Sequence, residues 1–291
     1  MARGTLTLRG VRFAWGTRTY VMGILNMTPD SFSGDGLLVD SPTDPVAAVV
    51  AHARRMAAEG ADLLDIGGES TRPGHQPVTM TEEMARVVPA VRAVRAALPA
   101  MPLSIDTTKP EVAEAALDEG GDVLNDVWAV GPHGEPLARL AARRGVPLVV
   151  THNRDVALYD DVTAEVVADL RAALARAERL GVPPGHLIVD PGIGFGKTVD
   201  HNLVLLRDLA ALRVLDRPIL LGTSRKSTIG RVLDLPADQR LEGTLATTAL
   251  GVAAGVDIVR VHDVLANRRA ARMADAIVRV GGLPDEEAPP P

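Results

Sequence analysis

The chain of 291 residues contains no cysteine. This absence excludes disulfide bonds, thiolate-bound zinc and a cysteine nucleophile. Aromatic residues make up only 2% of the sequence, whereas the apolar fraction is 46%. A sizeable core is therefore possible, but it must be built mainly from alanine, valine, leucine and isoleucine side chains.

Long runs of one residue class are also missing. There is no long basic run and the net charge is −6, so neither nucleic acid nor an anionic membrane is expected as the main partner. The opening MARGTLTLRG has no apolar segment of the secretory type. The longest small and apolar run, residues 245–256, is too short and too rich in Thr and Gly to cross a bilayer. We expect a soluble, cytoplasmic protein.

Short apolar runs alternate along the chain with stretches of helical periodicity such as 45–60 and 81–98. The apolar runs are typical of parallel strands that are covered on both faces. They are residues 20–26, 62–67, 102–106, 122–126, 147–152, 187–190, 218–222 and 257–262. Eight such strand–helix units in roughly 250 residues predict an α/β fold of the (β/α)8 TIM-barrel type. A doubly wound open sheet is the alternative.

No linker or shift in composition marks a second domain. Residues 1–18 alternate in a strand-like way and are expected to form a short N-terminal β-hairpin that closes the bottom of the barrel. Residues 19–281 are expected to form the barrel itself. Residues 282–291 are rich in proline and acidic residues, and we expect them to be disordered.

Polar side chains gather where the predicted strands end, which is the end of a barrel that carries the active site. A first group combines carboxylate, amide and ammonium groups: Asp106, Asn125, Asp190 and Lys226. This set suits a flat heterocycle with an aminopyrimidine edge, whose N–H groups donate to carboxylates. A second group suits an anion such as a diphosphate: Asn26, Arg72, Arg260 and His262. A single strand-end aspartate could equally cap the next helix, so the prediction rests on the convergence of the whole set.

The stretch DPGIGFGKT, residues 190–198, has the composition of a phosphate-binding loop. The spacing of such a loop would require a glycine at the position of Pro191, which argues against a nucleotide. Its glycines would instead let the backbone bend closely around a ligand. We expect Lys197 to anchor this loop, with a solvent-facing position as the alternative.

Seven motifs resemble those of the dihydropteroate synthase family and occur in that family's order from about residue 20 to about residue 280. They are MGILNMTPDSFSGDG (22–36), DIGGESTRPG (65–74), SIDTTKP (104–110), NDV (125–127), DPGIGFGK (190–197), GTSRKS (222–227) and RVHDV (260–264). The resemblance implies a pterin-binding (β/α)8 barrel in folate biosynthesis. Such an enzyme joins para-aminobenzoate to 6-hydroxymethyl-7,8-dihydropterin diphosphate and releases diphosphate.

The resemblance also implies a role for each matching residue. The pterin would be held by Asp106, Asn125, Asp190 and Lys226. The diphosphate would be bound by Asn26, Arg72, Arg260 and His262, with Asn26 also a ligand of Mg²⁺. The para-aminobenzoate slot would be lined by Thr71, Arg72, Pro73, Phe195, Lys226 and Ser227. The residues closest to the chemistry would be Asp106, Lys226, Arg260 and His262.

The family resemblance further implies a homodimer, for which the alanine-rich stretch 241–280 offers a face. The first loop departs from the family pattern, since SFSGDG replaces the more usual Ser-Phe-Ser-Asp-Gly-Gly. Both sulfonamide-sensitive and sulfonamide-insensitive behaviour therefore stay open. The alternatives in function are a pterin-binding methyltransferase domain and a catalytically silent pterin-binding homologue.

Overall fold

The computed structural model describes residues 4–27, 44–69 and 78–279. Its main sheet consists of the parallel strands β3(Tyr20–Asn26), β4(Leu63–Gly67), β5(Leu103–Asp106), β6(Val123–Asp126), β7(Leu148–Thr151), β8(Leu187–Asp190), β9(Leu220–Leu221) and β10(Ile258–Val261). The strands lie in the order β8-β7-β6-β5-β4-β3-β10-β9. A parallel bridge between Val189 and Ile219 brings the two ends of this order together. The sheet therefore forms a nearly closed barrel, which confirms the predicted TIM-barrel fold and excludes the open sheet.

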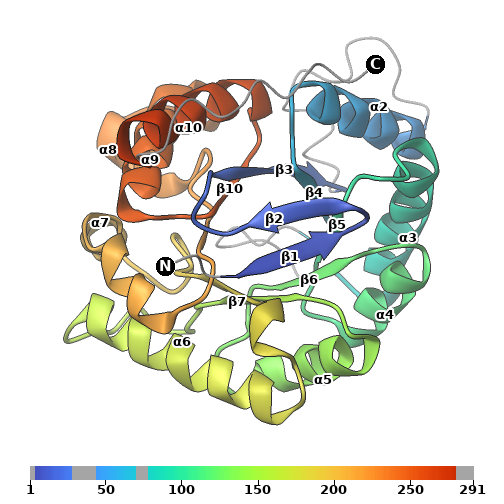
Figure 1. The fold of residues 1–291 in the computed structure, drawn as a ribbon, viewed down its shortest axis with the longest axis horizontal. Coiled ribbons are helices and arrows are strands. Elements are labelled where there is room, and N and C mark those ends of the chain that lie inside the picture. Colours follow the sequence, from blue (N-terminus) through green and yellow to red (C-terminus); the bar gives the residue numbers. More distant parts are fainter. Residues whose placement is uncertain (1–3, 28–43, 70–77, 280–291) are drawn as a thin grey trace.

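The helices form a ring around this barrel (Figure 1). They are α2(Pro45–Ala58), α3(Met80–Ala97), α4(Pro110–Asp118), α5(Glu135–Arg144), α6(Val162–Arg179), α7(Val199–Arg207), α8(Ser227–Leu233), α9(Leu241–Ala254) and α10(Val264–Val278). Short 3-10 turns occur at η1(Pro132–Gly134), η2(Pro184–His186), η3(Leu209–Leu215) and η4(Ala237–Gln239). Strands and helices alternate along the chain as the apolar pattern predicts.

Two elements differ from their expected bounds for local reasons. Helix α3 begins at Met80 rather than at residue 81, because Thr79 is its cap and accepts a hydrogen bond from the Glu82 backbone N–H at 3.2 Å. Strand β9 is shorter than the expected run 218–222. Pro218 has no N–H to donate to a neighbouring strand, although its carbonyl accepts from Val189 N at 2.9 Å.

The predicted N-terminal hairpin is present as the antiparallel strands β1(Thr5–Leu8) and β2(Val11–Ala14). It lies across one end of the barrel (Figure 1). The rings of Phe13, Trp15 and Tyr20 contact one another with centroids 4.8–5.6 Å apart. They pack on inward-facing residues near the starts of the strands, including Met22, Leu63, Val123, Val149, Ile188, Leu220 and Ile258. Three of the seven aromatic residues of the chain thus form a plug at the amino ends of the strands.

From the position of this plug we predict that a substitution within it lowers the stability of the protein without lowering its activity. Replacing the buried Phe13 by alanine should lower the free energy of unfolding by about 3–5 kcal/mol, because it leaves a cavity among large rings. Turnover should stay near that of wild type, since the active site of such a barrel is expected at the opposite end of the strands. Urea unfolding and turnover assays check this expectation. Arg12→Ala, an exposed position on the same strand, is the matched control, and a loss of kcat in folded Phe13→Ala would contradict it.

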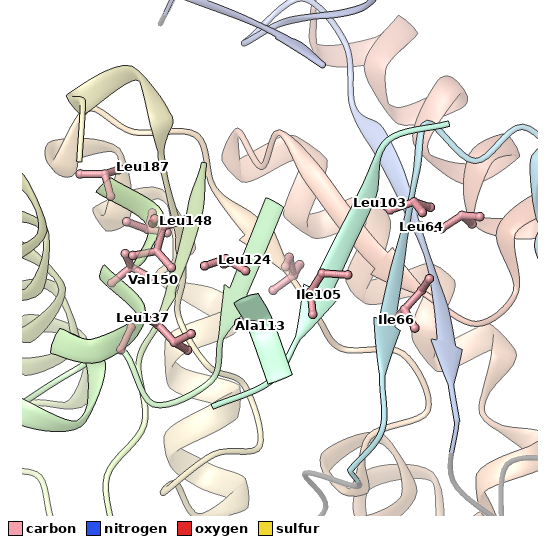
Figure 2. Close-up of a cluster of buried hydrophobic side chains, with 14 of the residues drawn as sticks. Leu64, Ile66, Leu103, Ile105, Ala113, Leu124, Leu137, Leu148, Val150 and Leu187 are labelled. Atoms are coloured by element: carbon pink, nitrogen blue, oxygen red, sulfur yellow. The ribbon is translucent and has the colours of Figure 1, made fainter. Parts of the chain in front are cut away.

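The main core lies between the outer faces of the strands and the helices. Figure 2 shows Leu64, Leu103, Leu124 and Leu148 on the strands within this layer. Side chains alternate along a strand, so Leu103 and Ile105 face the helices while Asp106 points into the barrel. The same alternation in β4 places Asp65 inside. Because their apolar neighbours are buried against the helices, Asp65 and Asp106 point into the barrel, towards the carboxyl ends of the strands.

Candidate active site

The centre of the site is an arginine between two aspartates. Arg260 donates from Nε to Asp65 Oδ2 and from Nη2 to Asp106 Oδ2, both at 2.6 Å. Asn125 Nδ2 also donates to Asp65 Oδ2, at 3.1 Å. These side chains come from β4, β5, β6 and β10, and Asp65 is fully buried. The barrel thus brings together residues that are far apart in the sequence.

Two acceptor atoms of this centre have no hydrogen-bond partner among the described residues: Asp65 Oδ1 and Asp106 Oδ1 are both buried. Burial raises the pKa of Asp106 to about 7, with the positive charge of Arg260 opposing the shift. Attraction to the two carboxylates raises the pKa of Arg260 despite its burial. A ligand that brings N–H donors to Asp106 would satisfy an acceptor that is otherwise costly to bury.

Asp190, Lys226 and Arg260 converge on a second wall. An ideal Cβ placed on Gly222 would lie 3.7–3.9 Å from atoms of all three side chains, so the glycine keeps this space open. Burial lowers the pKa of Lys226 to about 8, with the negative charge of Asp190 opposing the shift. Lys226 Nζ donates to the Ile193 carbonyl and lies 4.3 Å from the centroid of the Phe195 ring. The structure therefore places three predicted site residues, Asp190, Lys226 and Phe195, around one space.

Ser224 fixes the orientation of His262. The Ser224 hydroxyl accepts from His262 N at 3.1 Å and lies 2.9 Å from His262 Nδ1. Oγ has a second lone pair, so the contact with Nδ1 forms in either direction, and the ring proton is on Nε2 when the hydroxyl donates. Arg225 next to it is held by Asp263 at 2.8 Å. Ser224 thus holds the His262 ring through Nδ1 at the carboxyl end of β10.

Several predicted residues need individual comment. Arg260 was expected beside His262 on a diphosphate, and its guanidinium contacts Asp106 of the heterocycle group together with Asp65. Asn26 ends β3 and is half-buried, and Ser227 is exposed at the first position of α8. The remaining predicted residues lie outside the described part of the chain: Thr71, Arg72 and Pro73.

The prediction gave Asp65 and Ser224 no role. Asp65 lies in the middle of the buried strand β4 and faces inward, and Gly67 two residues later pairs with Asp106 on β5. The alternation of inward and outward side chains along these strands could be read from the sequence. It would have placed Asp65 near Asp106 inside the barrel. Ser224 lies in GTSRKS, but its pairing with His262 depends on how β9 and β10 lie together, which no local pattern reports.

The glycine-rich loop after β8 is held by its lysine. Gly192, Gly194 and Gly196 have positive φ values of 69°, 85° and 53°, which are favourable only for glycine. A Cβ on Gly192 would lie 1.8 Å from the His152 carbonyl oxygen. Lys197 Nζ donates to the Gly192 and Phe195 carbonyls at 3.0 Å. Lys197 is therefore a loop anchor, as expected, and its ammonium group is directed into the loop.

Asp126 gives a pH dependence that can be tested separately. It is buried at the end of β6, where Oδ1 accepts from Trp128 N at 2.9 Å. Burial raises its pKa from 3.8 to about 7. Between pH 3.8 and about 7 the folded protein therefore keeps this proton, whereas the unfolded chain loses it. The contribution of Asp126 to the unfolding free energy is complete below pH 3.8 and is lost as the pH rises through about 7.

The Asp126→Asn variant should lack this dependence. Relative to it, the wild-type protein should lose about 2–3 kcal/mol of unfolding free energy between pH 5 and pH 8.5. Urea unfolding of both proteins at the two pH values measures the difference. Parallel changes in the two proteins would show that Asp126 ionises normally.

Known proteins similar to this chain share both its sequence and its fold. The family model "Pterin binding enzyme" matches residues 22–262. The dihydropteroate synthase of Clostridium beijerinckii is 46% identical over 268 residues, which cover 92% of this chain and 97% of that protein.

Solved structures agree with this match. A dihydropteroate synthase of Clostridium difficile, crystallised in the presence of pteroic acid, superimposes with a TM-score of 0.85 at 45% identity and covers 91% of this chain and 98% of its own. The Xanthomonas albilineans dihydropteroate synthase with 4-aminobenzoic acid gives a TM-score of 0.87 at 41% identity, covering 97% of this chain and 100% of its own. The similarity therefore extends over essentially the whole barrel.

Proposed function

The chain belongs to the pterin-binding enzyme family, among its dihydropteroate synthases, and from this premise we infer that it condenses 6-hydroxymethyl-7,8-dihydropterin diphosphate with para-aminobenzoate. The reaction releases diphosphate and forms dihydropteroate in folate biosynthesis. The relatives argue against the methyltransferase alternative, because the similar proteins and structures described above are dihydropteroate synthases.

One observation carries the assignment of the pterin end: a buried carboxylate oxygen, Asp106 Oδ1, that has no partner among the described residues. Asp106 is held in place by Arg260, and Asn125 lies within the same network through Asp65. An aminopyrimidine edge offers N–H donors to such acceptors. We assign the pterin to Asp106, Asn125, Asp190 and Lys226, with Arg260 and Asp65 as the pair that orients Asp106.

The diphosphate end is assigned to Asn26 and His262. Among residues 4–27, 44–69 and 78–279, no three His, Asp or Glu side chains gather to hold a metal ion. Mg²⁺ often binds through few protein oxygens, with water and substrate phosphate completing its shell. The Asn26 amide oxygen at the barrel mouth fits that mode, and bound Mg²⁺ would neutralise charge on the diphosphate.

The residues suit a displacement at the exocyclic methylene carbon of the pterin. The C–N bond to the arylamine forms, the C–O bond to diphosphate breaks, and the amine proton passes to solvent. No protein nucleophile is required, which agrees with the lack of cysteine. With the Ser224 hydroxyl donating to Nδ1, His262 Nε2–H is placed to stabilise negative charge on the leaving group. Asp106 and Asp190 are placed to stabilise positive charge on the pterin.

Phe195, Lys226 and Ser227 are assigned to the para-aminobenzoate slot. The Phe195 ring lies beside Lys226 Nζ, which also faces Asp190. An arylamine stacked on Phe195 would therefore lie next to the pterin. This arrangement would hold the two reacting atoms close together, which lowers the entropic cost of the condensation.

We also propose a homodimer formed through α8, α9 and α10. Large apolar side chains are exposed on these helices: Val232, Leu233, Leu250, Leu265, Met273, Ile277 and Val278. Exposed apolar surface of this extent is typical of an interface. Sedimentation equilibrium should give a dimer for the wild-type protein and a shift towards monomer for Leu250→Glu, with Val156→Glu, an exposed position on another face, as control. A wild-type monomer would contradict the proposal.

The described part of the chain holds no helix long and apolar enough to span a membrane. The cytoplasmic location stays a prediction.

Product identification tests the proposed function. The protein, Mg²⁺, dihydropterin diphosphate and para-aminobenzoate should together yield a compound with the mass of dihydropteroate. The product should disappear when para-aminobenzoate is omitted. A folded protein that binds the pterin but forms no adduct would be a silent binding homologue.

A further inference from the structure

Lysine is scarce in this chain and confined to one region. The sequence has three lysines, at positions 109, 197 and 226, whereas all other side-chain cations apart from histidine are arginines. Lys109 follows β5 closely, and Lys197 and Lys226 follow β8 and β9. All three therefore lie at the carboxyl end of the barrel. Lys197 has no part in the proposed chemistry, so its buried ammonium group needs its own explanation.

The ammonium group of Lys197 lies among several acceptors. Nζ lies 3.0 Å from the Gly192 carbonyl oxygen, 3.0 Å from that of Phe195 and 2.9 Å from His152 Nδ1, with the His152 carbonyl oxygen at 3.4 Å. An ammonium group has three N–H donors, and the three shorter contacts use all of them. Lys197 thus closes the loop 192–197 on itself and ties it to the end of β7.

His152 is prepared to receive this contact. Its Nε2 lies 3.1 Å from Asp169 Oδ2, and Asp169 is itself held by Arg154 at 2.7 Å. Burial and the neighbouring Lys197 lower the pKa of His152 to about 4, so the ring is neutral near pH 7. With its proton on Nε2 facing Asp169, Nδ1 is an acceptor directed at Lys197.

The loop that Lys197 holds carries the wall of the arylamine slot. The Ile193 carbonyl accepts from Lys226, and the Phe195 ring lies under the same ammonium group at 4.3 Å. Two neutral contacts also hold the loop: Asn202 Oδ1 accepts from Gly194 N at 2.8 Å, and Tyr159 donates to the Gly196 carbonyl at 2.9 Å. Lys197 binds the carbonyl of Phe195 itself and that of Gly192 before it, and so sets where the ring lies.

We propose that Lys197, held by His152 and Asp169, is a positioning residue that fixes Phe195 and the Ile193 carbonyl for binding of the arylamine substrate. The proposal rests on the proposed function, because it takes Phe195 as the wall of the para-aminobenzoate slot. The backbone of Asp190 is part of β8, and its Oδ1 accepts from Gly192 N at 2.7 Å, at the first residue of the loop. Phe195 lies further along the loop from β8, so loss of Lys197 should disturb the arylamine more than the pterin.

The absence of cysteine permits a test by removal and chemical rescue. In Lys197→Cys the new thiol is the only one in the chain, so S-aminoethylation in urea followed by refolding rebuilds an ammonium group at nearly the length of lysine. Arg207→Cys, which lies on the surface of α7 and is treated in the same way, controls for the chemistry. The wild-type protein taken through urea controls for refolding.

The expected result is a split between the two substrates. The KM for para-aminobenzoate in Lys197→Cys should rise on the order of tenfold or more, as for loss of a hydrogen bond to a charged group. The KM for the pterin diphosphate should stay near wild type. Aminoethylation should restore the first value, and Lys197→Met should show the same split in a protein that cannot be rescued.

Three results would overturn the proposal: unchanged KM values in a folded variant, an equal rise for both substrates, or a split that aminoethylation leaves in place. If Lys197→Cys does not fold, Lys197→Met decides by the same split. A wild-type protein without para-aminobenzoate-dependent turnover would reject the proposed function. Normal wild-type turnover with an unaffected variant would reject the positioning role alone.

Discussion

The Asp106→Ala variant is expected to bind 6-hydroxymethylpterin at least about 100-fold more weakly than the wild-type protein, and to lose turnover with it. Removing the carboxylate deletes a charge-assisted hydrogen bond to the ligand, which contributes about 1.5–3 kcal/mol. It also takes away one of the two partners of Arg260, so the guanidinium no longer orients the pterin end. Isothermal calorimetry with the pterin and a turnover assay measure the two losses.

Controls separate this effect from a loss of structure. Asp106→Asn keeps the shape and one acceptor oxygen but not the charge, and should bind with intermediate affinity. Asp122→Ala removes another arginine-paired aspartate, which contacts Arg95 at 2.6 Å at the start of β6. It should lower stability and leave pterin affinity unchanged. Wild-type affinity in folded Asp106→Ala would remove Asp106 from the pterin site.

Replacing Arg260 by alanine is expected to lower kcat/KM by about 10²–10³-fold and the free energy of unfolding by about 3–5 kcal/mol. The stability loss arises because Asp65 and Asp106 would remain buried without their cation. The activity loss arises because Asp106 would no longer be held against the pterin. Both losses share one cause, so Arg260 should affect pterin binding as well as turnover.

Arg260→Lys sharpens this prediction. Lysine keeps the positive charge but presents it at one point, so it cannot contact both carboxylates as the guanidinium does. We expect most of the stability to return and much of the activity to stay lost. Arg279→Ala, which breaks a pair with Asp275 at 2.6 Å, serves as the control away from the site. Unchanged kcat/KM in Arg260→Ala would exclude a role in the site.

The fold was predictable because each barrel strand carries its own signal. A strand covered on both faces needs a short apolar run, and β4 and β5 show it as DLLDIG and PLSID. The hairpin was predictable from alternation in residues 5–14. The exact extent of β9 was not, because it depends on the partner of Pro218 across the closing seam of the barrel.

The candidate site was predictable as a set, since every strand of a parallel barrel presents its carboxyl end at the same face. The pairings within the set were not predictable. The expectation for Arg260 did not include its contacts with Asp65 and Asp106, which are 195 and 154 positions away. Which residues contact Arg260 depends on which side chains face into the barrel and on how the barrel closes. The combination of the two cannot be read from the local sequence. The contact between Lys197 and His152, 45 positions away, was hidden for the same reason.

The most direct test of the account measures diphosphate release from dihydropterin diphosphate with Mg²⁺, in the presence and absence of para-aminobenzoate. We predict release that requires both substrates, with one dihydropteroate formed for each diphosphate. Release at the same rate without para-aminobenzoate, or no release from a protein that binds the pterin, would contradict the claim that this barrel carries out the condensation.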